Sequence, residues 1–313
     1  MTTSAIDDMT PMAQIQRRYG VVGREGELAA AVAAIGAGRH LLLEGPVGVG
    51  KTTVALAVCR HLGREPQRVD GGNALMAVEP LVRALRGGRV LFIAELDRLP
   101  EAGQGLLLGA LAEGLVETPG GAAVRAADGF QVVATQSFVE GAATGQLSAA
   151  LRDRFERLTL RWQDAAEEAA IVAADTGSDD VALITTAVRL TRATRLHPRF
   201  RKGASVRGAS ATVAIAERLW AANREACGSV NRETLRRAAA AALAGRVELR
   251  DEPDGRGDLD GRDESEGHGD AGRGDDSDAR FAAALDELFE LVVERGEDPD
   301  VVLAPAGGDS TDV

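Results

Sequence analysis

The sequence predicts an α/β domain with a parallel sheet, followed by a small all-helical domain and a disordered acidic tail. Three observations carry this prediction. Short apolar runs alternate with helical segments up to about residue 161, as in parallel sheets covered by helices on both faces. Helical segments without a convincing strand follow as far as residue 250. Residues 251–278 then have almost no apolar content.

The α/β domain is expected to span residues 20–161. Residues 1–19 lack periodicity and are expected to form a mobile N-terminal segment. A helix is predicted over residues 25–35, because this stretch is rich in alanine and ends at glycines. A second helix is expected to begin at Lys51. Buried strands are predicted from short apolar runs at residues 40–43, 90–93 and 130–134.

The helical domain is expected to span residues 162–250. Its predicted helices cover residues 164–174, 179–194, 210–223 and 232–244. Residues 251–278 hold twelve acids against three arginines, which is the composition of a disordered linker. Residues 279–313 are expected to form an amphipathic helix around Phe281 to Val292, followed by a loose C-terminus.

Charge and composition exclude several classes of protein. The net charge is -12, but residues 251–313 carry -16, so residues 1–250 are slightly basic and the acidity belongs to the tail. No apolar run is long enough to span a membrane, the first residues lack a secretory pattern, and two cysteines make no disulfide framework. Aromatic residues are 3% and the basic ones form no stripe, which disfavours nucleic-acid binding. We therefore expect a cytoplasmic protein with no membrane or nucleic-acid partner.

A glycine-rich segment lies between the first predicted strand and the helix that begins at Lys51. Its sequence, GPVGVGKT, fits the pattern G-x-x-x-x-G-K-[ST] of a phosphate-binding loop. Glycines let the backbone wrap around a phosphate, the lysine supplies a charge for the β- and γ-phosphates, and Thr52 offers a hydroxyl to Mg²⁺. The predicted nucleotide-binding residues are Gly45, Pro46, Val47, Gly48, Val49, Gly50, Lys51, Thr52 and Thr53.

The second predicted strand ends in acidic residues. It reads VLFIAELDR, with Glu95 and Asp97 at its carboxyl end. A buried strand that ends in acids, downstream of a phosphate loop, is where such proteins hold Mg²⁺ and activate water. We therefore expect Thr52, Glu95 and Asp97 to be the candidate metal ligands, and ATP and Mg²⁺ to be the cofactors.

Several spaced motifs together resemble one protein family. They are VVGREGEL, LLLEGPVGVGKT, VLFIAELDRLPEAGQGLLLGALAEG, GFQVVATQS, LSAALRDRFERL and HPRFRKGASVRGA, and they occur in the family's order. Over about residues 20–250 the chain resembles AAA+ ATPases of the MoxR type, which are related to the ATPase subunit of magnesium chelatase. The resemblance implies a P-loop AAA+ sheet flanked by helices, then a helical lid domain.

The resemblance also implies individual residue roles. Glu95 would polarise the attacking water, and Arg154 would be the arginine finger that reaches the γ-phosphate of a neighbouring subunit. Arg207 would be the sensor arginine of the lid. Val21 and Val22 would lie near the adenine. A finger supplied in trans can be worth about 10³–10⁵ in rate, because it neutralises charge in phosphoryl transfer.

The chain departs from the family's pattern at three places. Ala94 stands where the family usually has Asp, and it cannot hold Mg²⁺ or its waters. Asp97 compensates only if the strand continues that far. Ser137 stands at the sensor asparagine position and has a different donor pattern. The stretch from residue 69 to 82 is also shorter than in the family, where an insert faces the central pore. We expect ATP binding to survive these changes, and hydrolysis and substrate engagement to be the two functions that they affect.

Three functional hypotheses follow from these observations. The first is a ring-forming, by resemblance hexameric, ATPase that remodels or activates a partner protein in a chaperone-like way. Such a partner would carry a von Willebrand factor A domain or be a metalloenzyme. The second is a regulatory subunit that binds nucleotide with weak or no turnover, which Ala94, Ser137 and the short stretch 69–82 favour. The third is the ATPase subunit of a metal chelatase.

Overall fold

The computed structural model describes residues 10–72, 74–118, 121–137, 147–222, 230–250 and 273–303. The chain divides after Gln163 into two compact units. In the part of the chain that is described, no helix combines the length and the apolar character needed to cross a lipid bilayer.

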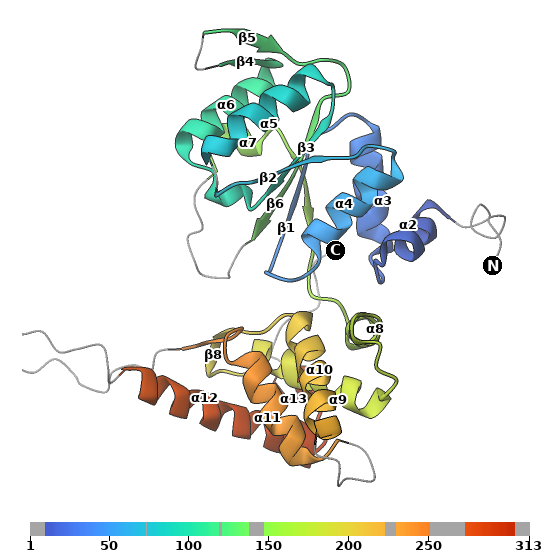
Figure 1. Cartoon of the computed structure of the whole chain (residues 1–313), viewed down its shortest axis with the longest axis vertical. Helices are drawn as coiled ribbons and strands as arrows, with labels where there is room; N and C mark the ends of the chain where they lie inside the picture. The colour runs from blue at the N-terminus through green and yellow to red at the C-terminus, as the bar shows by residue number, and fades with distance from the viewer. Residues whose placement is uncertain are drawn as a thin grey trace, which may run out of the picture. The chain divides into compact units, whose positions relative to one another are not determined.

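The first unit is built on a five-stranded parallel sheet with the order β2-β3-β6-β1-β7 (Figure 1). Its strands are β1 (Leu41–Gly45), β2 (Gln67–Asp70), β3 (Val90–Ala94), β6 (Gln131–Ser137) and β7 (Glu156–Thr159). The three inner strands β3, β6 and β1 are the ones that the apolar runs predicted. The edge strands β2 and β7 were missed, because each is mostly exposed or half-buried and therefore carries no apolar run.

Helices cover both faces of this sheet (Figure 1). The helices on one face are α2 (Pro11–Tyr19), α3 (Glu25–Gly36) and α4 (Lys51–His61). The other face carries α5 (Ala74–Arg86), α6 (Glu101–Ala112), the short α7 (Ala149–Arg152) and a hairpin of β4 (Leu115–Glu117) and β5 (Ala123–Arg125). Successive β1 residues alternate between two cores: Leu41 and Leu43 lie in the first, and Leu42 in the second.

The expectation of a mobile segment at residues 1–19 is wrong for its second half. Residues 11–19 form α2, with Thr10 as its N-cap, Pro11 in its first turn and Gly20 as a left-handed C-cap. Ile15 is fully buried in the first core. The capping residues and this one buried side chain stabilise a helix that is too short to show periodicity. Residues 1–9 lie outside the described residues.

The second unit is mostly helical. Its helices are α8 (Ala165–Thr176), α9 (Val181–Leu196), α10 (Val206–Ala222), α11 (Arg232–Leu243), α12 (Arg273–Phe289), a π-helical turn (Glu290–Glu294) and α13 (Pro299–Val302). A small ribbon of β8 (Phe200–Lys202) and β9 (Glu248–Leu249) pairs two segments where no strand was predicted. Strands this short carry no recognisable alternation, so only the tertiary pairing reveals them.

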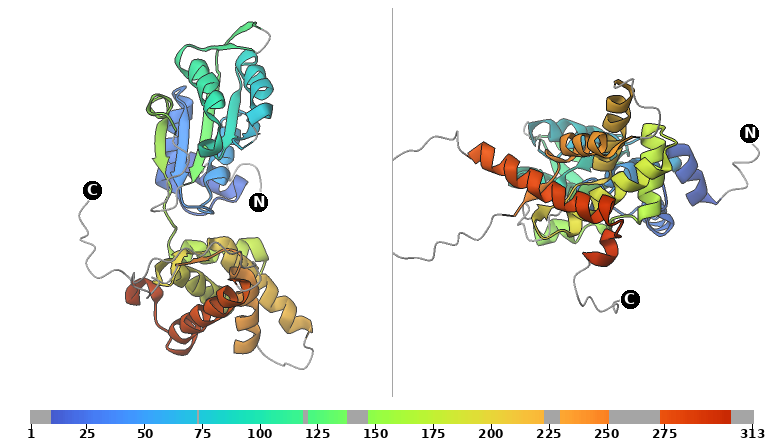
Figure 2. Two further views of the ribbon diagram at one scale, coloured as in Figure 1. Left: turned by 90° about the vertical axis from the view of Figure 1, so that its left-hand side faces the viewer. Right: turned by 90° about the horizontal axis from the view of Figure 1, so that it is seen from below.

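The C-terminal helix belongs to the second unit. The predicted acidic linker 251–278 lies outside the described residues as far as 272, but α12 already begins at Arg273. Leu288 and Phe289 are buried in the same core as Val188 of α9. Figure 2 shows the ribbon of α12 lying against the other helices of the second unit. The helical domain therefore includes the helix that was predicted to follow it. The residues beyond 303 lie outside the description.

Candidate nucleotide-binding site

The glycine-rich loop connects β1 to α4, as its motif requires. Gly45 ends β1 with φ 150°, and a Cβ at this position would lie 2.2 Å from the carbonyl oxygen of Leu160. Gly50, with φ 88°, is the left-handed N-cap of α4. Both positions need glycine: the first because the backbone of Leu160 approaches it, the second because of its conformation. The loop thus leads into the amino end of a helix, where backbone N–H groups are free to bind an anion.

Lys51 is the first residue of α4 and is 7% exposed. Its Nζ donates to the carbonyl oxygens of Gly45 at 2.8 Å and of Pro46 at 2.7 Å. Burial lowers the pKa of Lys51 to about 8, and the charges of Asp97 and Glu95 partly oppose this shift. The printed hydrogen bonds of this buried cation go to neutral carbonyls, so it gains favourable charge interaction when an anion binds within reach of the loop.

The carboxyl end of β3 carries the first acidic candidate. The strand stops at Ala94, and Glu95 follows in a left-handed conformation with φ 55°. Its backbone N–H donates to Thr135 Oγ1 at 3.3 Å. The Glu95 carboxylate pairs with Arg98 at 3.0 Å, and 42% of its side chain is exposed. The ion pair engages Oε2, one of the two carboxylate oxygens that can accept a hydrogen bond.

Asp97 lies in a 3₁₀ turn, Leu96–Arg98, and not on the strand. Asp97 was expected to compensate for Ala94 only if the strand extended as far as residue 97, and the strand ends before it. Nevertheless, its Oδ1 is buried with no hydrogen-bond partner among the described residues, and its charge acts on Lys51 more strongly than that of Glu95 does. A buried carboxylate oxygen without a partner is costly unless a cation or donor completes it. Asp97 is thus the acid that best fits a metal ion.

The end of β6 lies directly beside the phosphate loop. Ser137 is in register with Gly45, and Gln136 is in register with Glu44. Ser137 is half-buried, whereas Oε1 of Gln136 is buried without a hydrogen-bond partner in the described part of the chain. The structure therefore brings the predicted sensor serine to the loop. It adds Gln136 and Thr135 as polar neighbours. Sequence reasoning missed both, because it placed a buried strand at residues 130–134 and a functional residue only at Ser137.

The predicted arginine finger, sensor arginine and adenine-contacting valines lie on other elements than the loop and the strand ends. Arg154 is exposed in the turn that joins α7 to β7. Arg207 is exposed on the first turn of α10 in the second unit, so its relation to the phosphate loop stays a prediction. Val21 is buried in the core that also contains Val49 of the loop. Val22 is half-buried, and its carbonyl oxygen accepts a hydrogen bond from Gln163 Nε2 at 2.7 Å.

Arg24 is a further loop neighbour that sequence reasoning did not single out. It is 8% exposed, and its Nη2 donates to the carbonyl oxygen of Val49 at 2.9 Å. Its position in the motif VVGREGEL could have marked Arg24 as a candidate site residue. An abundance of arginine in the chain made any one of them look like a surface residue.

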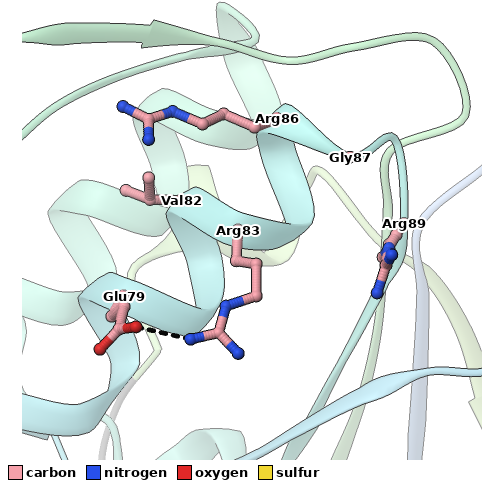
Figure 3. Close-up of a pocket in the computed structure, with 6 residues that line it drawn as sticks. All are labelled: Glu79, Val82, Arg83, Arg86, Gly87 and Arg89. Carbon is pink, nitrogen blue, oxygen red and sulfur yellow. Dashed lines mark hydrogen bonds and ion pairs between the residues drawn. The ribbon is translucent and has the colours of Figure 1, made fainter.

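A separate surface pocket of about 390 Å³ lies at the opposite edge of the sheet (Figure 3). It is lined by Glu79, Val82, Arg83, Arg86, Gly87 and Arg89. Arg83 is paired with Glu79 at 2.5 Å, and the guanidinium groups of Arg86 and Arg89 point in different directions. These groups do not converge on one ligand. The pocket precedes the amino end of β3, whereas the phosphate loop follows the carboxyl end of the parallel strand β1.

Comparisons with known proteins show what the first unit is similar to. Residues 22–160 match the family of Holliday junction DNA helicase RuvB P-loop domains. Protein MoxR of Methylorubrum extorquens is 33% identical over 153 residues, which cover 43% of this chain and 44% of that protein. The Holliday junction branch migration complex subunit RuvB of Bifidobacterium adolescentis is 38% identical over 121 residues, 37% of this chain and 33% of that protein. The chain therefore spans less than half the length of these curated relatives.

A solved structure supports the fold. A mutant of Thermotoga maritima RuvB superposes with a TM-score of 0.52 at 22% identity, over 70% of each chain. At this identity the likeness concerns the fold alone. Together the matches confirm the predicted P-loop AAA+ fold and the resemblance to MoxR-type ATPases.

Proposed function

Because the first unit is a P-loop AAA+ ATPase domain of the MoxR and RuvB type, we propose that the protein binds and slowly hydrolyses ATP. One observation carries the proposal: the buried Lys51 lies on the glycine-rich loop within electrostatic reach of Asp97 and Glu95. A phosphate-binding cation next to carboxylates that suit Mg²⁺ is the arrangement that phosphoryl transfer requires.

The residues present fit a bound Mg²⁺ ion. Thr52 would contribute its hydroxyl, and Asp97 has a buried carboxylate oxygen that lacks a partner among the described residues. Glu95 is a third candidate. When bound, Mg²⁺ would neutralise charge on the phosphates. No group of three or more histidines, cysteines or acids in the described residues could hold a metal without help, so the phosphates would have to complete its coordination.

Slow turnover is the expected kinetic behaviour. Ala94 provides no metal-side carboxylate, Glu95 is paired with Arg98, and Ser137 replaces the sensor amide. Loss of one such charge-neutralising group costs several kcal/mol, and each 1.36 kcal/mol is a factor of ten. These features support the second candidate, a nucleotide-binding regulatory subunit, if turnover proves negligible.

The assembly and the partner are proposed by resemblance. A ring of identical subunits, with Arg154 of each reaching the neighbour's γ-phosphate, is supported by the exposure of Arg154. Arg207 would act from the lid, and Val22 would lie near the adenine. The partner would be a protein with a von Willebrand factor A domain or a metalloenzyme, and the ring would act in the cytoplasm. A chelatase subunit is the remaining alternative.

Paired lysine substitutions test the proposal. Lys51→Ala should abolish ATP binding measured by calorimetry, since the loop loses its cation. The chain has one other lysine, Lys202, which pairs with Glu248 in the second unit, so Lys202→Ala is a matched control that should bind ATP like the parent. Unchanged ATP affinity and turnover in Lys51→Ala would refute the assignment of the loop.

A gain-of-function variant tests the proposed cause of slow turnover. Ala94→Asp should raise phosphate release at saturating Mg-ATP about tenfold or more, with ATP affinity nearly unchanged. The gain should vanish in Arg154→Ala, because both groups act on the γ-phosphate. A parent that already turns over at typical enzyme rates, with no gain from Ala94→Asp, would mean that Asp97 or another group has taken over the metal, and it would remove the main support for a regulatory subunit.

A further inference from the structure

The side chain of Arg24 joins two segments that are far apart in the sequence. Nη2 donates to the carbonyl oxygen of Val49 in the phosphate loop and to that of Arg161, both at 2.9 Å. Nη1 is paired with Glu27 at 2.9 Å. Arg161 lies two residues before Gln163, the last residue of the first unit. One buried guanidinium therefore bonds both the phosphate loop and the segment that leads into the second unit.

The backbone of Arg24 indicates that this position is held by its surroundings. Arg24 has φ 65°, a left-handed conformation that costs free energy in any residue with a Cβ. The preceding Gly23 is also left-handed, and its carbonyl oxygen accepts from Gln16 Nε2 at 2.7 Å. The neighbouring carbonyl of Val22 accepts from Gln163. The segment 21–24 is thus fixed both to the first unit and to the start of the connection.

Contacts at the other end of the phosphate loop reach the same connecting segment. The N–H of Leu160 donates to the carbonyl oxygen of Glu44 at 2.8 Å, and Leu160 O is the atom that a Cβ on Gly45 would meet. The buried carboxylate of Glu44 is paired with Arg157 of β7 at 2.6 Å. Both the beginning and the end of the loop are therefore fastened to the stretch from residue 157 to 161.

We propose that Arg24 is a positioning residue that links nucleotide occupancy of the phosphate loop to the segment 159–163, which connects the two units. This inference rests on the proposed function. The peptide between Val49 and Gly50 is planar and trans, so its C=O and N–H point in opposite directions. By holding Val49 O, Arg24 fixes the direction of the Gly50 N–H, a donor at the amino end of α4. Any change at that peptide is transmitted through the guanidinium to Arg161.

Linkage makes this coupling reciprocal. If the connecting segment holds Arg24 in place, the loop is preorganised for phosphate, and bound phosphate in turn stabilises the connecting segment. Couplings of this kind change equilibria about 5- to 150-fold. Without Arg24, nucleotide should still protect the loop, but the response of the connecting segment should become much smaller, because the contacts that remain in the described part of the chain are those of Glu44 and Gly45 with residues 157–160.

Amide hydrogen exchange with Arg24→Lys tests the proposal. Lysine keeps the charge but lacks the planar fork that bonds two carbonyls and Glu27 together. In the parent, saturating Mg-ATP should slow exchange in both 45–51 and 159–163, the latter about fivefold or more. In Arg24→Lys the response of 45–51 should persist, whereas that of 159–163 should be lost or much smaller. Arg39→Ala is the matched control: it removes an exposed arginine paired with Glu156 of β7, and both segments should still respond.

Two outcomes would overturn the proposal. One is a parent in which Mg-ATP protects 45–51 and leaves 159–163 unchanged, a result that needs no variant. The other is an Arg24→Lys protein that keeps both responses. If the parent shows no response to ATP anywhere, the proposed function fails instead. In that case the exchange rates of the parent and of Arg24→Lys are compared without nucleotide. Faster exchange of both 45–51 and 159–163 in Arg24→Lys supports the link through Arg24, and unchanged exchange refutes it.

Discussion

The depressed pKa of Lys51 predicts that nucleotide affinity depends on pH in the mildly alkaline range. Burial lowers this pKa from 10.5 to about 8. The folded protein therefore releases the lysine proton near pH 8, whereas the unfolded chain keeps it to about 10.5. Between these values the unfolded state binds more protons, so the stability of the nucleotide-free protein rises with pH in that window. Nucleotide binding has the opposite dependence, because phosphate favours the charged lysine.

The size of the effect follows from the same linkage. Below pH 8 Lys51 is already protonated, and ATP affinity should be constant. Above pH 8 each binding event must first return a proton, so affinity should fall about tenfold per pH unit. The phosphates do not obscure this trend above pH 8, because their last ionisation lies about two pH units lower and is nearly complete there. Near pH 8 binding should take up about half a proton per site.

Calorimetry with ATP in metal-free buffer measures both quantities. Titrations at pH 7, 8 and 9, each in two buffers of different ionisation enthalpy, give the affinity and the number of protons taken up. Asp97→Asn should move the midpoint to lower pH, because Asp97 raises the pKa of Lys51. Constant affinity from pH 7 to 9 without proton uptake would refute the argument, as would a midpoint that Asp97→Asn leaves in place.

Three structural predictions follow. Gly45→Ala should destabilise the first unit by at least about 2 kcal/mol in urea unfolding, since its Cβ meets Leu160 O; a wild-type unfolding midpoint would contradict the close approach. Phe289→Ala should destabilise the second unit by about 3–5 kcal/mol by the same assay, because Phe289 is 1% exposed in that core; a cost below about 1 kcal/mol would mean that α12 is not part of it. Glu168→Gln should lower the free energy of unfolding of the second unit by about 3 kcal/mol, because this buried carboxylate pairs with Arg192 and Arg195. Unchanged stability at pH 7 would disprove that pairing.

Local sequence was sufficient for the parts of the site that lie on one stretch of chain. The order of a strand, a glycine-rich loop and a helix predicted Gly45 to Thr52 as the phosphate loop. The acidic end of β3 predicted Glu95. Asp97 was named for the wrong structural reason: it was considered as a strand residue and lies in a turn. Arg24 and Gln136 were missed, because their partners are more than twenty residues away or on neighbouring strands. No local pattern reports a contact of that kind.

The sequence by itself determined the parallel sheet, the phosphate loop and the helical character of the second unit, because hydrophobic period and glycine placement are local properties of the chain. The tertiary structure decided where the edge strands and the β8–β9 ribbon pair, that residues 11–19 fold into a helix around Ile15, and that α12 completes the second core. It also decided that Lys51 titrates near pH 8 and that Arg24 joins Val49 to Arg161. Burial and long-range hydrogen bonds arise only when distant segments pack, so their energies are absent from any single segment of the sequence.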